Sequence, residues 1–290
     1  MRTSDCGRCR SVGLRLPRRR DRPLPGWRED QANPPHVLSG RPQSRNTQRG
    51  PDVKKAIITT VGFLLLAALF LAGCGASLTG SGNLKTEEHT FSGFTNVDVS
   101  SAFEFSIIKG DSYGVSVTVD DNVLEKLRVT KDGDTLKIDF KAGVFVGRVT
   151  LEAVVTMPQL RGLTVSGASH GTVSGFSSTE NLALDLSGAS TVTGDITAGD
   201  ADFELSGAST VELKGSATNL IATVGGSSHL KLADFVVTNA DVTLGGSSNG
   251  TVNLSGRLDA DLGGSAELSY LGEPTMGNIN TGGSSKIRKE

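Results

Sequence analysis

The sequence contains few residues of several types on which common functional sites depend. Three of its 290 residues are cysteine, and none follows Cys74, so the chain beyond that residue forms no internal disulfide. Aromatic residues make up 5% of the chain, too few for the stacked platforms that bind bases or sugars. Neither a phosphate-binding loop nor a calcium-binding glycine and aspartate nonapeptide is present. Packing and backbone hydrogen bonds must therefore hold the fold.

Positive charge is scarce beyond the first 52 residues. Residues 1–52 contain 12 of the 17 arginines and seven of the nine prolines, whereas the chain from Cys74 onward has 15 Lys and Arg against 26 Asp and Glu. The acidic excess repels nucleic acid, so we expect no nucleic-acid partner. Residues 1–52 lack apolar periodicity and are predicted to be disordered, or to be a mis-annotated leader ahead of a start at Val53. Cys6 and Cys9 form a Cys-x-x-Cys without a second ligand pair, so no zinc or redox site is predicted.

Residues 53–73 have the three parts of an export signal in order. Lys54 and Lys55 supply positive charge, and the apolar run from Ala56 to Leu71 is short for a membrane span. The run ends in Leu71-Ala72-Gly73-Cys74, the pattern that precedes a lipid-modified cysteine. The alternative is an uncleaved membrane anchor with an incidental cysteine. We expect a lipoprotein signal peptide over 53–73, lipidation at Cys74, a flexible tether over 74–90, and a location in the cell envelope outside the cytoplasmic membrane.

Beyond residue 163 the sequence repeats a short mark of small residues. Ser-Gly-Ala-Ser begins at 166, 187 and 206, Gly-Gly-Ser-Ser at 225, 245 and 282, and Gly-Gly-Ser-Ala at 263. The intervals are 21, 19, 19, 20, 18 and 19 residues. Residues one and three positions before each mark are mostly apolar and the residue between them is polar, as in Leu184-Asp185-Leu186. This period-two alternation predicts a β-strand in every unit, and a second apolar pair after each mark predicts another.

A unit of about 20 residues can travel once around a small closed coil and return one strand spacing higher. The sequence therefore predicts an all-β fold, a parallel β-solenoid (β-helix) with coils of about 20 residues over 91–290. Residues 91–160 are β-rich but out of register, and we expect them to form less regular coils that cap one end. A turn is predicted at 131–134 and one helical turn over 121–127.

The glycine and serine of each mark have a structural explanation. The second residue is always Gly, which accepts a positive φ at a sharp corner. The fourth residue is Ser in six marks, and we expect a row of small side chains inside the corner whose stacked hydroxyls bond to one another: Ser169, Ser190, Ser209, Ser228, Ser248 and Ser285. A sugar-binding or nucleophilic serine row is the less favoured alternative.

Outward carboxylates are the candidates for chemistry. Asp185 and Glu204 are predicted to stack on adjacent coils about 5 Å apart, with Asp195, Asp200 and Asp202 nearby. Thr223 and Thr243 follow in the same row, and Asp261 lies beyond them. His170 and His229 fall three coils apart, too far to share a metal. We therefore predict no catalytic residue, no metal and no cofactor.

The order of several segments resembles a known family. Phe94-Thr95-Asn96-Val97-Asp98-Val99, then Val117-Thr118-Val119-Asp120-Asp121-Asn122-Val123, then Met157-Pro158-Gln159-Leu160 and the Gly-Ala-Ser and Gly-Gly-Ser repeats, are similar to the head GIN domain family of putative auto-transporter adhesins. The resemblance covers about residues 91–275. It implies the β-solenoid fold and an adhesin-like role, and it carries no catalytic or binding residues.

Three functions follow as hypotheses. The first is a lipid-anchored, non-catalytic binding or structural module with an envelope polysaccharide or protein partner. The second is a carbohydrate-active enzyme, a polysaccharide lyase or hydrolase, that uses Asp185 and Glu204. The third is an envelope-stress sensor held near a membrane partner.

Overall fold

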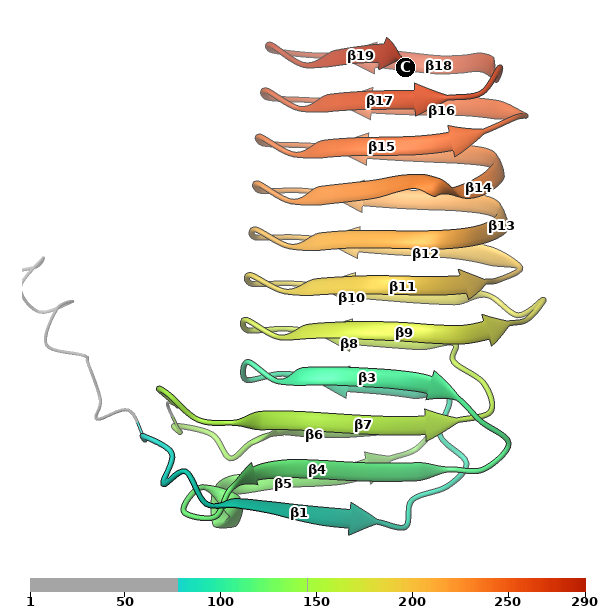
Figure 1. The fold of residues 1–290 in the computed structure, drawn as a ribbon. Coiled ribbons are helices and arrows are strands. Elements are labelled where there is room, and N and C mark those ends of the chain that lie inside the picture. The colour runs from blue at the N-terminus through green and yellow to red at the C-terminus, as the bar shows by residue number, and fades with distance from the viewer. Residues whose placement is uncertain (1–77, 145) are drawn as a thin grey trace, which may run out of the picture. The chain divides into compact units, whose positions relative to one another are not determined.

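The repeated apolar alternation forms stacked β-coils. A computed structural model describes residues 78–144 and 146–290, and the predictions for Cys6, Cys9, Cys74 and the segments 1–52 and 53–73 concern residues outside this range. Each repeat unit contributes one stretch of strand to each of two opposed ladders, and equivalent residues of neighbouring units pair in parallel register, as Asp185 pairs with Glu204. The coils stack along one axis, as Figure 1 shows. The predicted parallel β-solenoid is confirmed.

One ladder, which we call face A, lies at the front of Figure 1. Its pairing order is β1 (Leu84–His89), β4 (Gly114–Asp120), β7 (Leu151–Met157), β3 (Glu104–Lys109), β9 (His170–Ser177), β11 (Thr191–Thr197), the first parts of β13 (Thr210–Val224) and β14 (His229–Leu244), β15 (Asn249–Leu254), β17 (Glu267–Leu271) and β19 (Lys286–Lys289).

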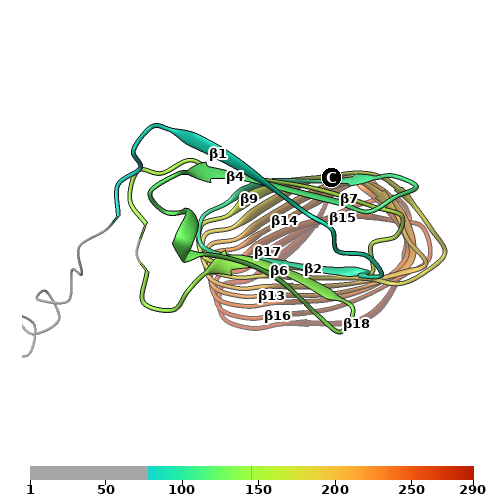
Figure 2. The same ribbon diagram turned by 90° about the horizontal axis from the view of Figure 1, so that it is seen from below.

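The opposite ladder, face B, closes the coils. Its order is β5 (Leu127–Asp132), β6 (Thr135–Phe140), β2 (Asn96–Val99), β8 (Gly162–Val165), β10 (Leu182–Leu186), β12 (Asp200–Leu205), the later parts of β13 and β14, β16 (Arg257–Leu262) and β18 (Thr275–Thr281). Seen along the axis in Figure 2, the two faces form a flattened coil.

The inward side chains of both faces form one continuous hydrophobic core. Phe203 and Phe235 are fully buried on successive coils, with ring centroids 6.0 Å apart and an interplanar angle of 51°. Around them stack Leu186, Leu205 and Val224, which are at most 2% exposed. Because every coil repeats the same apolar positions, burial extends along the whole stack, which is how repeat folds obtain their stability.

The small-residue marks form the corner from face B to face A. The second residue of each mark is a glycine with φ between +70° and +77°. A Cβ on Gly246 would lie 2.5 Å from the carbonyl oxygen of Gly226 on the coil below, so neighbouring backbones approach too closely for a side chain. The seven glycines are Gly167, Gly188, Gly207, Gly226, Gly246, Gly264 and Gly283.

The serine row lies inside this corner, as predicted. The prediction that its hydroxyls bond to one another is wrong. The serines at 169, 190, 209, 228 and 248 are 0% exposed. The Ser209 hydroxyl donates to the carbonyl of Ser206 at 2.8 Å, three residues earlier in its own coil. The Ser228 hydroxyl accepts from the amide of Ser209 at 3.2 Å. The backbone carbonyl three residues earlier is within hydrogen-bond distance of each such hydroxyl, whereas the serine of the next coil is one strand spacing away. The hydroxyl therefore donates to the carbonyl.

The N-terminal coils are not stacked in chain order. The coil formed by β2 and β3 lies between the coil of β6 and β7 and the coil of β8 and β9. The chain thus runs from β3 outward through antiparallel β4 and β5, returns as β6 and β7, and passes the first coil to begin the regular repeats. The predicted turn joins β5 to β6, and the predicted helical turn is the 3-10 turn η1 (Leu124–Lys126).

The predicted flexible tether over 74–90 is wrong at its C-terminal end. Residues Leu84–His89 form β1, which pairs antiparallel with β4 over its full length. Strand pairing outweighs the Gly, Ser and Thr content of the segment, because Gly and Ser precede Leu84 and are absent from the strand itself. This strand, η1 and β5 cover the open end of the solenoid. We call the described residues of 78–89 and 120–150, which contain these three elements, the cap. No helix among residues 78–144 and 146–290 is long and apolar enough to cross a membrane.

Candidate functional site

Face B carries a trough where small residues interrupt a row of larger ones. The outward row runs Asn96, Gly162, Ala183, Asp202 and Ile221 from strand to strand. Glycine and alanine at its centre leave two adjoining hollows of about 490 and 330 Å³, which share Ala183 and Asp202. The trough therefore extends over β2, β8, β10, β12 and β13.

Five carboxylates line the trough, four on its walls and a fifth, Asp200, on its rim. Asp185 and Glu204 are directly paired on β10 and β12, as predicted, and Asp202 lies in the neighbouring row. Asp98 on β2 completes the set. Burial raises the pKa of Asp98, the Asp139 and Asp185 carboxylates add to this, and Lys137 opposes it. The trough thus presents concentrated negative charge with an apolar floor.

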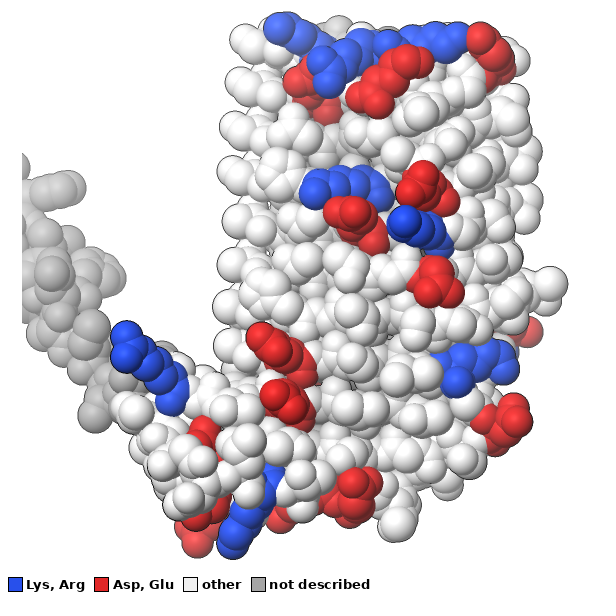
Figure 3. All heavy atoms as spheres, in the orientation of Figure 1, with Lys and Arg blue, Asp and Glu red and all other residues white. Residues whose placement is uncertain are grey.

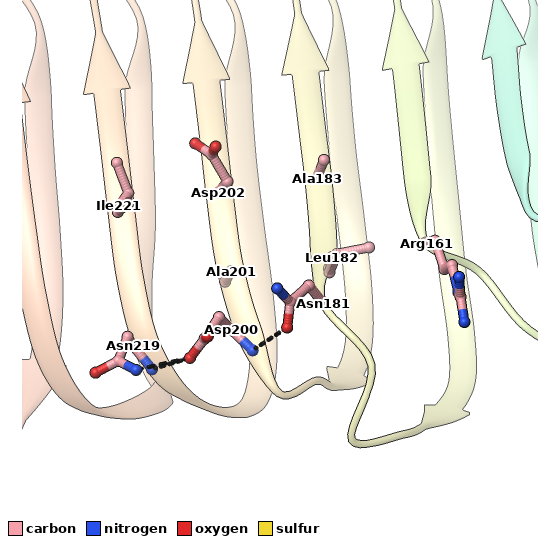
Figure 4. A pocket seen from close by; sticks show the side chains of 9 residues that line it. All are labelled: Arg161, Asn181, Leu182, Ala183, Asp200, Ala201, Asp202, Asn219 and Ile221. Atoms are coloured by element: carbon pink, nitrogen blue, oxygen red, sulfur yellow. Dashed lines mark hydrogen bonds between the residues drawn. The ribbon is translucent and has the colours of Figure 1, made fainter.

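A ladder of amide and carboxylate side chains forms one rim of the trough (Figure 4). Asn181 Oδ1 accepts from the amide of Asp200 at 3.3 Å, and Asp200 Oδ1 accepts from Asn219 Nδ2 at 2.7 Å. Asn239 Nδ2 then donates to Asn219 Oδ1 at 3.0 Å. Each of these residues stands six positions before a mark, a repeat signal that our sequence reasoning missed.

A second rim residue is Arg161, which no sequence pattern singled out. Its Nη2 donates to Glu180 Oε2 at 2.6 Å, and both side chains are about half exposed. Arg161 lies at the edge of the larger hollow, and Figure 4 shows it beside Leu182 and Asn181. A ligand in the trough would therefore meet one guanidinium besides the carboxylates.

The remaining predicted residues lie apart from the trough. Asp195 is on β11 of face A, where its Oδ2 accepts from the amide of Gly175 at 3.0 Å. Asp261 continues the row beyond Thr223 and Thr243. His170 and His229 are three strand spacings apart on face A, because Thr191 and Thr210 occupy the two intervening positions of the same row. Within the described residues no group of three His, Cys, Asp or Glu could hold a metal ion.

Face A has a shallower hollow of about 410 Å³ over β3, β7, β9 and β11. Its outward residues include the paired Glu104 and Glu152, the hydroxyls of Ser106 and Thr172, and Val154, which is 44% exposed. Figure 3 shows broad uncharged areas on this face with a few charged clusters. Face A therefore offers a flatter and less charged surface than the trough.

The nucleophile-elbow spacing Gly-x-Ser-x-Gly occurs three times, at 110–114, 167–171 and 246–250, and sequence reasoning overlooked it. The central serines of the last two are Ser169 and Ser248, which are 0% exposed and donate to local carbonyls. Ser112 lies in the turn between strands β3 and β4, whereas an elbow joins a strand to a helix. None of the three has the geometry of a nucleophile.

Solved structures share this fold. A "putative adhesin" from Bacteroides fragilis NCTC 9343 superposes with a TM-score of 0.70 at 18% identity, covering 74% of this chain and 100% of that chain. A "putative lipid binding protein" from Parabacteroides distasonis ATCC 8503 has a TM-score of 0.61 at 22% identity, with the same coverage. A "putative adhesin" from Parabacteroides merdae ATCC 43184 has a TM-score of 0.58 at 16% identity, again with the same coverage. At these identities the likeness establishes the fold alone.

Sequence comparison gives the family. A search of curated proteins found no match. The family model described as "putative auto-transporter adhesin, head GIN domain" matches residues 93–274, which include the trough, six of the seven marks and all of the cap except its N-terminal segment with β1. The resemblance seen in the strand motifs and the marks is thereby confirmed, and the chain belongs to the head GIN domain family.

Proposed function

We propose that this protein is a lipid-anchored, non-catalytic binding module of the cell envelope, similar in role to an adhesin. The observation that carries the proposal is the trough on face B, a hollow formed by Gly162 and Ala183 between polar rims on an otherwise regular solenoid. The export signal ending in Cys74 supports the location. The names of the structural relatives, two adhesins and a lipid-binding protein, agree with binding as the activity.

The chemistry of the trough favours a polysaccharide with hydroxyl and amino groups. The carboxylates of Asp185, Asp202 and Glu204 accept hydrogen bonds from such groups, and the amides of Asn181 and Asn219 both donate and accept. Hydrogen bonds to a charged acceptor are about twice as strong as neutral ones, so an amino sugar would gain most. The exposed side chain of Ile221, 54% accessible, provides an apolar contact for a sugar ring.

Binding is tested with the full chain on a panel of envelope glycans that includes deacetylated amino sugars. We expect the double variant Asp185→Asn/Glu204→Gln to lose about tenfold in affinity, the magnitude of one charge-assisted hydrogen bond. The matched control is Asp241→Asn/Asp261→Asn, which makes similar changes on face B outside the trough. Equal affinity of both variants and the wild type would contradict the proposal, and capture of a basic protein segment in place of glycan would replace the polysaccharide with a protein partner.

Glycan cleavage is the second candidate function, favoured by Asp98. Its pKa is raised by burial, as a general acid requires, and two strand spacings separate the backbones of Asp98 and Asp185, about 9.6 Å and thus at the upper limit for such a pair. Inverting glycosidases place their carboxyl groups about 6.5–9.5 Å apart. Against cleavage, the carboxylates project from one ladder and do not flank a bond from two sides. Turnover of any glycan in the panel that is lost in Asp98→Asn would establish the enzyme.

The lipid anchor is tested separately by labelling cells with radioactive palmitate. We expect the wild type to incorporate label and Cys74→Ser to incorporate none, because the thiol is the acceptor. Label that persists in Cys74→Ser would place the modification elsewhere, and absence of label from the wild type would overturn the anchor.

A further inference from the structure

The first described residues are built into the cap. The carbonyl of Leu78 accepts from the amide of Gly147 at 2.8 Å, and the amide of Gly80 donates to the carbonyl of Arg148 at 2.8 Å. Leu78 also forms a β-bridge with Val146. The chain is therefore fixed to the loop between β6 and β7 from Leu78 onward.

A second set of bonds holds the next residues. The amide of Gly82 donates to Asp120 Oδ1 at 2.6 Å, and the amide of Ser81 donates to Asn122 Oδ1 at 3.1 Å. Asn122 Nδ2 donates to the carbonyl of Thr79 at 2.8 Å. The Asp120-Asp121-Asn122 sequence thus acts as a clasp on residues 79–82.

The clasp limits how far the cap can move from the proposed anchor. Four peptide steps join Cys74 to Leu78, and a fully extended chain spans at most about 14 Å over that length. That reach is less than twice the Debye length of about 8 Å at physiological ionic strength. A lipid on Cys74 would therefore keep Leu78 within about 14 Å of the headgroups, from where the cap can approach to within one Debye length.

Charge distinguishes the cap from the rest of the domain. The cap, residues 78–89 and 120–150, has seven basic and eight acidic residues and is nearly neutral, whereas residues 151–290 contain seven basic and 15 acidic ones. Several cap acids are engaged: Asp120 accepts from the amides of Gly82 and Thr150, and Asp139 pairs with Arg128. The coils beyond the cap are repelled by an anionic surface, and the cap is not.

Three basic residues of the cap are exposed, two of them neighbours at η1 and the third next to the clasped residues 79–82. The amide of Lys141 donates to the carbonyl of Lys126 at 2.9 Å, and Arg148 bonds through its carbonyl to Gly80. No ion pair within residues 78–144 and 146–290 engages these three side chains, which are Lys126, Lys141 and Arg148. Figures 1 and 2 show η1 and the start of β1 at the same end of the solenoid.

We propose that the cap docks on an anionic lipid surface through Lys126, Lys141 and Arg148, which hold the solenoid with its cap against the membrane and its later coils away from it. The proposal rests on the lipid anchor proposed at Cys74. Each Lys or Arg near an anionic leaflet strengthens attraction by roughly fivefold, and attachment through Cys74 makes these contacts intramolecular.

The test uses the full lipidated protein in vesicles of phosphatidylglycerol and phosphatidylcholine, compared with phosphatidylcholine alone. A fluorophore is attached to Ala142→Cys in the cap or to Ser284→Cys on the last coil, both exposed positions, and headgroup quenchers are placed in the vesicles. We expect strong quenching at 142 and little at 284. We also expect Lys126→Glu/Lys141→Glu/Arg148→Glu, or high salt, to reduce quenching at 142 several-fold in the anionic vesicles.

Two controls separate the possible failures. Lys109→Glu/Lys214→Glu/Lys231→Glu reverses three charges outside the cap and should leave quenching unchanged. Insertion of eight Gly and Ser residues before Leu78 should weaken it, because a longer tether lowers the effective concentration of the cap. Lipid label on Cys74 with equal quenching at 142 and 284 would overturn cap docking alone, whereas absence of label would overturn the anchor itself.

Discussion

The amide of Gly82 donates a 2.6 Å hydrogen bond to Oδ1 of Asp120, a carboxylate that is 2% exposed at the end of β4. The other oxygen, Oδ2, accepts from the amide of Thr150 at 2.8 Å. One buried side chain thus joins the segment before β1 and the start of β7 to the same strand.

Replacing this carboxylate should destabilise the cap. Asp120→Ala leaves two backbone amides, each only partly shielded from water, without their acceptor. A typical hydrogen bond contributes about 0.5–1.5 kcal/mol, so we expect a loss of about 1–3 kcal/mol. Urea unfolding followed by circular dichroism measures it, with the exposed Glu88→Gln as control. Equal unfolding midpoints for both variants would show that the clasp contributes nothing to stability.

Adjacent glycines at one corner should respond differently to alanine. Gly246 has φ +71° and no room for a Cβ above Gly226, whereas a Cβ on Gly245 meets nothing within 4 Å. We expect Gly246→Ala to cost about 3 kcal/mol or more through strain and displaced backbone, and Gly245→Ala to change stability by less than about 1 kcal/mol. Thermal unfolding of the two variants compares them directly, and similar losses for both would disprove the close-approach explanation.

The buried serine row should matter through its hydrogen bonds. Ser228→Ala leaves the amide of Ser209 without the hydroxyl that accepts from it, and we expect a loss of about 1–2 kcal/mol. Ser227→Ala changes the exposed neighbour and should be nearly neutral. Amide hydrogen exchange at Ser209 gives a local measurement, since its protection should fall only in Ser228→Ala.

The raised pKa of Asp98 predicts a pH dependence. The folded protein holds this proton more tightly than the unfolded chain, because burial disfavours the carboxylate. Ionised Asp98 therefore opposes folding, and its effect develops as the pH rises from the unfolded value of 3.8 through the folded pKa. Asp98→Asn should be more stable than the wild type at neutral pH, and the difference should vanish below about pH 3. Asp241→Asn, also on face B, is the control for amide substitution.

The regular coils could be predicted from the sequence because the residues within each unit determine where its strands and its corner lie. The alternation around Asp185 and the glycine at 188 depend only on neighbours within the unit and on its copies, so period and register follow from spacing alone. The pairing of Asp185 with Glu204 came from the same spacing.

The cap and the trough could not be predicted in this way. The placement of β2 and β3 between later coils depends on which of several similar strands pair, and no local pattern encodes that choice. The trough depends on Gly162 and Ala183 standing in one outward row, which is visible only when the register of β2, β8 and β10 is known. The ladder of amide and carboxylate side chains on the rim has no apolar periodicity, so the pattern that predicts the strands does not reveal it.

The glycine row also separates length from shape. Each unit of 18 to 21 residues returns the chain to the same corner one strand spacing, about 4.8 Å, further along the axis, with Gly246 stacked over Gly226 as Gly226 is over Gly207. Duplication or deletion of a unit beyond the trough therefore changes the height of the last coil while the cap and the trough keep their structure. A solenoid of this kind can therefore change its length in steps of one coil by gaining or losing whole units.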